Sequence, residues 1–202
     1  MANSLLDLVQ QQVLGGDSLD RISRQIGADR DTTASAISGA LPMLIGALSR
    51  NASRPDGAAA LAGALERDHD GSLLDDLGGF LGGNPAGMGE GILRHVFGNK
   101  RPAAETGLSG LSGLDKGSAG QLLAILAPIV LGALGRTQRK RGLDVSDLTS
   151  MLGREESRAR KQAPDALGML GQLLDADGDG DVMDDVAKMG AGLLGRFLKS
   201  RR

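Results

Sequence analysis

Apolar residues recur at helical spacing along almost the whole chain, and no segment alternates between apolar and polar positions as a strand would. A first helix is expected over 3–14, where Leu5, Leu8 and Val9 lie on one side and Gly15 and Gly16 end the helix. The same pattern predicts helices at 18–26, 30–49, 55–66, 72–82, 88–97, 115–135, 143–152, 165–174 and 182–199. The chain is therefore predicted to be all-α.

An internal repeat is the strongest feature of the sequence. The segment 41–50 (LPMLIGALSR) aligns with 127–136 (APIVLGALGR), and at the same offset of 86 residues Gly27 aligns with Gly113 and Asp29 with Asp115. Further along, 70–77 (DGSLLDDL) aligns with 179–186 (DGDVMDDV) at an offset of 109, so the second copy is longer by 23 residues. The polar stretch 153–163 is expected to hold much of this insertion.

Both copies carry a proline in the middle of their longest predicted helix, at Pro42 and Pro128. A proline there removes one backbone hydrogen bond and bends a helix. The Gly-Ala pair that follows each proline leaves room for another helix to pack closely. We therefore expect a duplicated helical bundle with Pro-kinked long helices, whose halves either pack on one another or intertwine.

The predicted organisation follows from this repeat. Residues 1–83 form the first helical repeat with its N-terminal helix, and 84–103 form a connecting helix or loop. Residues 104–202 form the second repeat, which ends in an acidic loop and a last helix.

Three segments also carry a family resemblance. The stretches 70–77 (DGSLLDDL), 91–98 (GILRHVFG) and 126–134 (LAPIVLGAL) resemble the YidB-like bacterial family, whose domain is known as domain of unknown function 937. The resemblance covers roughly residues 5 to 152, and the Asp-Gly-Asp-Gly tail is similar to tails in that family. It implies an all-helical fold with homeodomain-like halves, and it supplies no activity.

Composition excludes several classes of function. The chain has 32 glycines, no cysteine, tryptophan or tyrosine, and only three aromatic residues, Phe80, Phe97 and Phe197. Disulfides, thiolate chemistry and zinc–sulfur sites are therefore excluded, and base stacking on aromatic rings is not expected. A net charge of −2 gives no overall attraction to nucleic acid, which makes it an unlikely partner.

The longest apolar run, 122–134, is shorter than the roughly 20 residues that span a bilayer. The first 14 residues contain Asp7 and no basic residue, unlike a secretory signal. A cytoplasmic protein without a membrane span is expected.

The acidic loop 175–185 carries the clearest chemical signal. Its carboxylates at loop positions one, three and five, with Gly180 at six, resemble a calcium-binding EF-hand loop. Position twelve is Val186, where an EF-hand has glutamate. The candidate Ca²⁺ ligands are Asp175, Asp177, Asp179, Asp181, Asp184 and Asp185. The alternative is that these aspartates form turns and cap the last helix. For the counterpart residues in the first copy, Glu66, Asp68, Asp70, Ser72 and Asp75, a capping role is favoured.

The segment 19–37 resembles a helix-turn-helix, with Gly27 at the turn. Its second helix offers Arg30, Asp31 and Thr32 where a DNA reader presents basic or amide side chains, so DNA binding is the less favoured alternative.

Basic residues follow two long helices, at 136–141 and 196–202, as expected of solvated helix ends; a site for an acidic partner or nucleic acid is the alternative. A capping or packed position is expected for His95.

No catalytic signature is present: the sequence contains no Walker A segment, GxSxG or HExxH. The letters GxGxxG at 190–195 fall in a predicted helix without a preceding strand, so they do not indicate a dinucleotide site. We therefore expect a non-enzymatic helical interaction or scaffold module, with a protein partner or a second copy of itself. The alternative is a DNA-binding protein that uses the helix-turn-helix-like segments.

Overall fold

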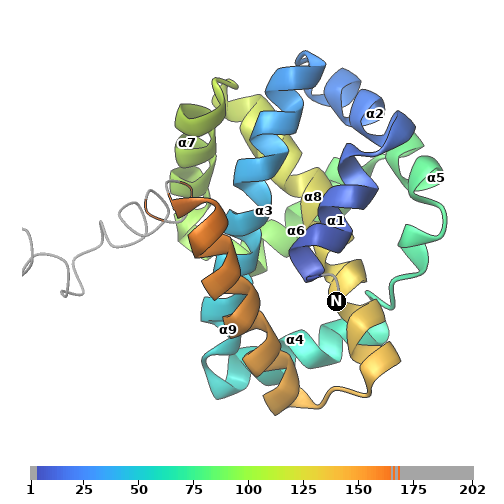
Figure 1. Cartoon of the computed structure of the whole chain (residues 1–202), viewed down its shortest axis with the longest axis vertical. Helices are drawn as coiled ribbons and strands as arrows, with labels where there is room; N and C mark the ends of the chain where they lie inside the picture. Colours follow the sequence, from blue (N-terminus) through green and yellow to red (C-terminus); the bar gives the residue numbers. More distant parts are fainter. Residues whose placement is uncertain (1–3, 165, 167, 169–202) are drawn as a thin grey trace, which may run out of the picture.

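A computed structural model describes residues 4–164, 166 and 168 of the chain, and these form a bundle of helices without strands (Figure 1). The α-helices are α1 Leu5–Leu14, α2 Gly16–Ile26, α3 Arg30–Ala52, α4 Pro55–Arg67, α5 Leu77–Gly82, α6 Pro85–Phe97, α7 Arg101–Ser112, α8 Lys116–Arg141 and α9 Val145–Gln162. Two short 3-10 helices, η1 Ser72–Leu74 and η2 Gly98–Lys100, precede α5 and α7. The all-α prediction is confirmed.

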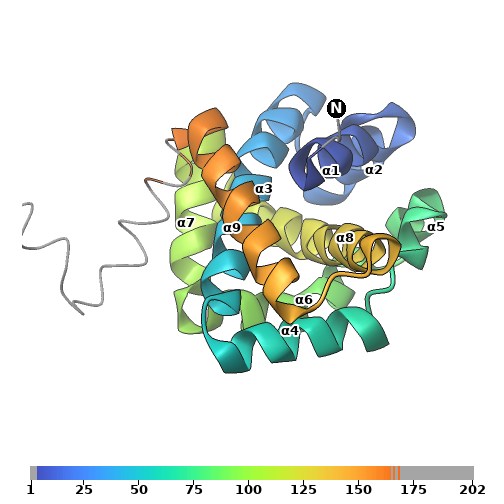
Figure 2. The same ribbon diagram turned by 60° about the horizontal axis from the view of Figure 1, so that its bottom comes forward.

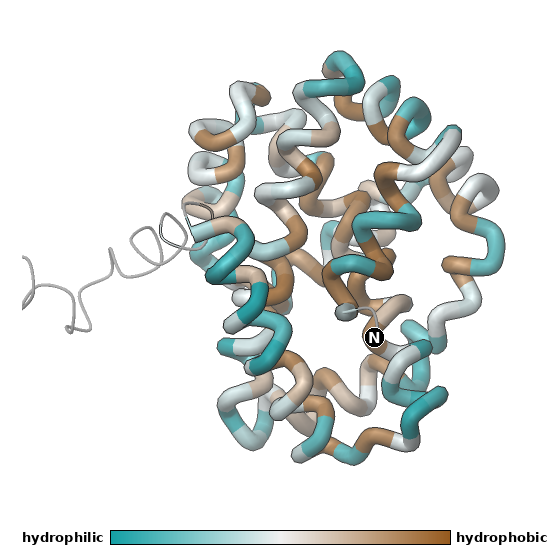
Figure 3. The backbone as a smooth tube through the Cα atoms, viewed as in Figure 1, coloured by the Kyte–Doolittle hydropathy of each residue, from teal (hydrophilic) through white to brown (hydrophobic). Residues whose placement is uncertain are grey.

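Helix α8 forms the centre of the bundle. In Figure 2 it lies between α1, α2 and α3 on one side and α4 and α6 on the other. Its closest neighbour is α6, because Gly89 has no side chain: a Cβ there would lie 1.7 Å from the carbonyl oxygen of Ala124. The apolar residues of α3 and α8 face inward, and hydrophilic residues cover the outer side of α9 (Figure 3). The buried residues from α1 to α9 form one hydrophobic cluster.

The two long helices begin in the same way. Gly27 and Gly113 both have left-handed backbone angles, with φ of 68° and 77°, and each ends the preceding helix. Asp29 then caps α3 by accepting a hydrogen bond from the Thr32 N–H, and Asp115 caps α8 by accepting from the N–H groups of residues 117 and 118. Similar local sequences at an offset of 86 therefore have similar local geometry.

Pro42 and Pro128 are buried inside α3 and α8, and both helices continue past them. The gap expected after the second proline is filled, although not by an α-helix. A Cβ on Gly132 would lie 3.0 Å from Cδ2 of Leu73, so the 3-10 helix η1 packs there.

The structure differs from the expected elements in three places. Helix α7 was not predicted, because Pro102, Gly107 and Gly110 interrupt its pattern; Pro102 lies in the first turn, where a missing N–H is tolerated. The single helix expected at 72–82 is broken at Asp76, whose carboxylate caps α5 at the Gly79 N–H. The helix expected at 143–152 continues to Gln162, so the polar stretch 153–163 is mostly helical. The helices expected at 165–174 and 182–199 lie largely or wholly outside the described residues.

Two helices of the described part, α3 and α8, are long and apolar enough to cross a membrane by length and composition alone. Within the fold, 67% of the apolar window of α3 and 83% of that of α8 are buried. A core helix meets the same two criteria, so this observation is weak evidence for a span.

Candidate functional site at the basic end of helix α8

The last two turns of α8 carry the cations Arg136, Arg139, Lys140 and Arg141. Gly142 ends the helix with φ of 60°, and its N–H donates back to carbonyls of the last turn. Cations are favoured there because the unpaired carbonyls give a helix C-terminus partial negative charge. Two different environments lie on the two sides of this basic end.

On one side, the acidic turn 66–76 neutralises two of the arginines. Arg136 donates from Nη2 to the carbonyl oxygen of Gly71 at 2.5 Å and to Oδ1 of Asp75 at 2.6 Å. Arg139 donates from Nη2 to the Glu66 carbonyl oxygen at 2.9 Å, and its Nη1 lies 3.4 Å from Oδ2 of Asp70. The acidic turn and the basic helix end are more than 60 residues apart in the sequence, and the fold brings them together.

Glycines allow this contact. Gly71 has φ of +90°, and a Cβ on it would lie 2.6 Å from Cβ of Arg136. A Cβ on Gly135 would lie 1.9 Å from the carbonyl oxygen of His69. Side chains at these positions would therefore separate the turn from the helix.

Asp70 forms an Asx turn alongside the ion pair, whereas the N-cap of η1 is Gly71. The Oδ1 of Asp70 accepts a hydrogen bond from the Ser72 N–H at 2.9 Å. Hydrogen bonds from Ser72, followed by the charges of Arg139 and Arg136, lower the pKa of this carboxyl below its usual value. His69, in the same turn, is half-buried, and burial lowers its pKa.

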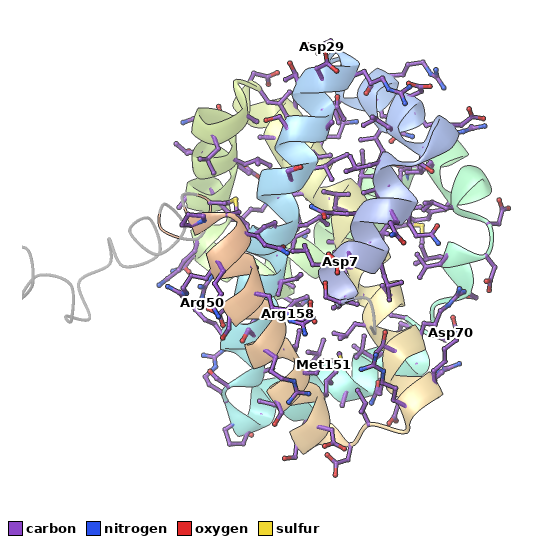
Figure 4. The ribbon with its side chains drawn as sticks, viewed as in Figure 1. Asp7, Asp29, Arg50, Asp70, Met151 and Arg158 are labelled. Atoms are coloured by element: carbon purple, nitrogen blue, oxygen red, sulfur yellow. The ribbon has the colours of Figure 1, made fainter. Side chains whose placement is uncertain are left out.

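On the other side of the basic end, a cavity of about 100 Å³ opens between α1, α8 and α9. We call it the basic cavity. Figure 4 shows Met151 and Arg158 on the side of α9 that faces α1. The lining residues are Ser4, Leu5, Leu8, Thr137, Arg141, Met151, Arg154, Glu155 and Arg158.

Glu155 is the buried anion of this cavity, with only 6% of its surface exposed. Its Oε2 accepts a hydrogen bond from the Leu6 N–H at 3.3 Å, so a carboxylate of α9 anchors the positive N-terminus of α1. Ser4 and Asp7 complete that end with a reciprocal capping box. The insertion prediction missed Glu155, although Asp144 as a helix cap and apolar residues at 148, 151, 152 and 159 point to an amphipathic helix.

The cations of the basic cavity outnumber its anion. Arg158 lies 3.7 Å from Oε1 of Glu155. Arg141 and Arg154 are exposed and, within the part of the chain that the structure describes, have neither a hydrogen bond nor an ion pair. The cavity therefore retains positive charge that no group of the described fold neutralises.

A larger depression of about 470 Å³ is open to solvent and is lined by residues of α1 and its end, from Asp7 to Gly15. It lies along one helix, so no groups from different elements converge on it. This makes it a weaker candidate than the basic cavity.

The predicted Ca²⁺ ligands, Asp175 to Asp185, lie outside the described residues. In residues 4–164, 166 and 168, no three His, Cys, Asp or Glu side chains gather as metal ligands would.

The half-buried His69 adjoins α8, whereas Nδ1 of the exposed His95 lies 2.9 Å from the Gly91 carbonyl oxygen within α6. His95 is therefore exposed rather than packed, and its ring bonds to a carbonyl of its own helix.

Within the helix-turn-helix-like segment 19–37, the second helix has its one basic residue engaged. Arg30 forms an ion pair with Asp20. The equivalent helix of the second copy, α8, is buried over most of 119–135, whereas a DNA-reading helix must expose one side. Both observations count against base recognition by these helices.

Comparison with known proteins identifies a family. Neither the curated proteins nor the solved structures contain a match to this chain. Residues 7–137 match the family described as bacterial protein of unknown function (DUF937). The match covers the helices from α1 to most of α8 and ends before Arg141, Arg154 and Arg158. Because it spans well over half of the sequence, the chain belongs to the DUF937 family.

Proposed function

We propose that this protein is a non-enzymatic, cytoplasmic interaction module that binds an acidic segment of a protein partner in the basic cavity. The observation that carries this proposal is the uncompensated charge of Arg141 and Arg154 beside a cavity built from three helices. A carboxylate placed there gains charge-assisted hydrogen bonds to arginine, which binds carboxylates in a two-pronged geometry.

The apolar surface supports recognition by charge rather than by a broad hydrophobic face. Among the described residues, the large exposed hydrophobic side chains are Leu8, Met88 and Val145. Leu8 lines the basic cavity and is 40% exposed, so it offers an apolar contact next to the arginines. An acidic segment with one or two aliphatic residues fits this combination.

A fluorescent peptide of ten aspartates tests the proposal with the full-length protein. Anisotropy is expected to report binding at low ionic strength that weakens as salt is added, because exposed charges are screened. The double substitution Arg141→Gln and Arg154→Gln should weaken binding about ten-fold or more, at roughly 1 kcal/mol for each lost charge contact. Arg67→Gln, an exposed arginine on α4, is the matched control. If the double variant binds the peptide as tightly as the Arg67→Gln variant does, the proposal is wrong.

The duplication remains part of the proposal. We infer that α2–α3 and α7–α8 descend from one homeodomain-like unit whose long helix bends at Pro42 or Pro128. The shared glycine turns, aspartate caps and aligned sequences support this origin. Straight helix axes at both prolines would contradict the inferred bend.

We also propose that the acidic loop 175–185 binds Ca²⁺. The support is its sequence, since six carboxylates in eleven residues repel one another unless a cation neutralises them. Calorimetric titration with CaCl₂ should release or absorb heat, and Asp177→Ala with Asp179→Ala should abolish that heat. No heat at millimolar calcium would exclude the site.

DNA binding is the alternative function, and a gel shift at low salt separates it from protein recognition. A shift that weakens steeply with salt would favour DNA. The engaged Arg30 and the buried α8 lead us to expect no shift at micromolar protein.

A further inference from the structure

We propose that the protein's own acidic loop, residues 175–185, occupies the basic cavity and competes there with the acidic partner. This inference rests on the proposed function, because it names a competitor for the same site. It also makes the C-terminal segment a regulator of partner binding.

The first support is a contact that the chain already makes with itself. The acidic turn places Asp70, Gly71 and Asp75 against Arg136 and Arg139 of α8. The acidic loop repeats these residues at the same spacing, as Asp179, Gly180 and Asp184. A sequence of this kind is therefore able to present carboxylates and a glycine carbonyl to arginines at the end of α8.

The second support is charge complementarity. The acidic loop carries six aspartates in eleven residues. The basic cavity carries three arginines, two of which lack a partner in the described fold. Docking would reduce repulsion within the loop and pair Arg141 and Arg154 in one step.

The third support is reach. Glu155, at the cavity, precedes the end of α9 at Gln162 by seven residues, or about 10 Å of helix. Residues 163–174 connect that end to the loop, and twelve residues span up to about 40 Å when extended and about 18 Å as a helix. The connection is long enough in either form.

The counterpart position on α3 also carries a cation. Arg50 is the counterpart of Arg136 on α3, and it lies near Glu156 and Arg160 of α9. Burial lowers its pKa, while Glu156 acts in the opposite direction. Arg50 does not line the basic cavity, so it is not part of the proposed docking site.

The absence of cysteine from the chain allows a direct distance measurement in the full-length protein. Spin labels attached at Ala176→Cys and Gln12→Cys would report the distance between the acidic loop and the exposed side of α1, one turn beyond Leu8. Electron paramagnetic resonance should give a narrow, short distance distribution at low salt. That distribution should broaden and lengthen at high salt and when Arg141→Gln and Arg154→Gln are added, but not when Arg67→Gln is added.

Two results would overturn the inference. One is a broad distribution that neither salt nor the arginine substitutions change. The other is a short distance that persists without Arg141 and Arg154. A second label pair, Ala176→Cys with Asp31→Cys at the far end of α3, checks that the change is specific to the cavity.

Competition separates this inference from the proposed function. Replacing the six aspartates by asparagine should make the full chain bind the ten-aspartate peptide about ten-fold more tightly, because a short tether presents the loop at about millimolar effective concentration. Equal binding by both chains would reject the docked loop and leave the proposed function standing. If neither chain binds the peptide, the proposed function itself fails.

Discussion

The helix pair α2–α3 and the helix pair α7–α8 have the same turns and caps but different surroundings. Both turn at a left-handed glycine and begin the long helix at an aspartate. Helix α8 is then enclosed by α6, α7, α3 and the acidic turn, whereas α3 lies closer to the surface and is covered mainly by α9 and α7. Local sequence determines how each pair begins, and the neighbouring helices determine how deeply it is buried.

The largest expected effect on stability comes from two equivalent leucines, which compare how deeply α8 and α3 are buried. Leu134 in α8 is fully buried, and Leu48 at the same repeat position in α3 is 4% exposed. Leu→Ala should cost about 2–5 kcal/mol of unfolding free energy at either site, with the larger value at Leu134, because a cavity in the enclosed helix relaxes less. Urea unfolding checks this, and a larger loss at Leu48 would reverse our ranking of the two helices.

The next effect concerns a position where the copies differ in residue type. Gly135 in α8 leaves no room for a Cβ beside the His69 carbonyl, whereas its counterpart Ser49 in α3 already carries a side chain. Gly135→Ser should destabilise the protein by about 1–3 kcal/mol and loosen the acidic turn. Ser49→Ala should change the unfolding free energy by less than about 0.5 kcal/mol. Hydrogen exchange of the backbone amides of 70–76 would report the loosened turn, and unchanged protection in Gly135→Ser would contradict the close packing.

A smaller effect is expected at two equivalent serines. The Ser109 hydroxyl donates a hydrogen bond to the Leu114 carbonyl oxygen at 2.6 Å, whereas the buried Ser23 hydroxyl has no partner in the described part of the chain. Ser109→Ala should cost about 1 kcal/mol, and Ser23→Ala should be neutral or slightly stabilising. Thermal unfolding of the two variants tests this prediction, and equal losses of stability in both would contradict it.

The smallest effects belong to the two cap aspartates, which should respond alike. Hydrogen bonds from the Thr32 side chain and then its backbone lower the pKa of Asp29, and those from Ser118 do the same for Asp115. A pKa that is lower in the folded state stabilises the protein above the unfolded value near 3.8, and this stabilisation is lost as the pH falls through the folded value.

The drop in melting temperature between neutral pH and about pH 3 should therefore shrink slightly in Asp29→Asn and in Asp115→Asn. Asparagine keeps the capping oxygen without titrating, so it isolates the charge. Scanning calorimetry at the two pH values measures the drop. A change in only one variant would show that the two caps are not equivalent.

The candidate site was predictable only in its parts. The cations 136–141 and the aspartates of the acidic turn were recognised separately, but their pairing joins residues more than 60 positions apart. Glu155 was hidden because the stretch 153–163 is rich in charge, and only its spacing relative to Met151 and Ala159 marks it as part of a buried helical side.

The sequence by itself determined the helical class, the two glycine turns and the aspartate caps, because backbone angles and capping bonds depend on residues a few positions apart. It also indicated the repeat and the family. Tertiary structure alone decided that α8 is the central helix, that η1 fills the space beside Gly132, and that Arg141 and Arg154 meet at one cavity. Those features depend on which distant surfaces pack together, and helical spacing specifies the buried side of a helix without specifying its partner.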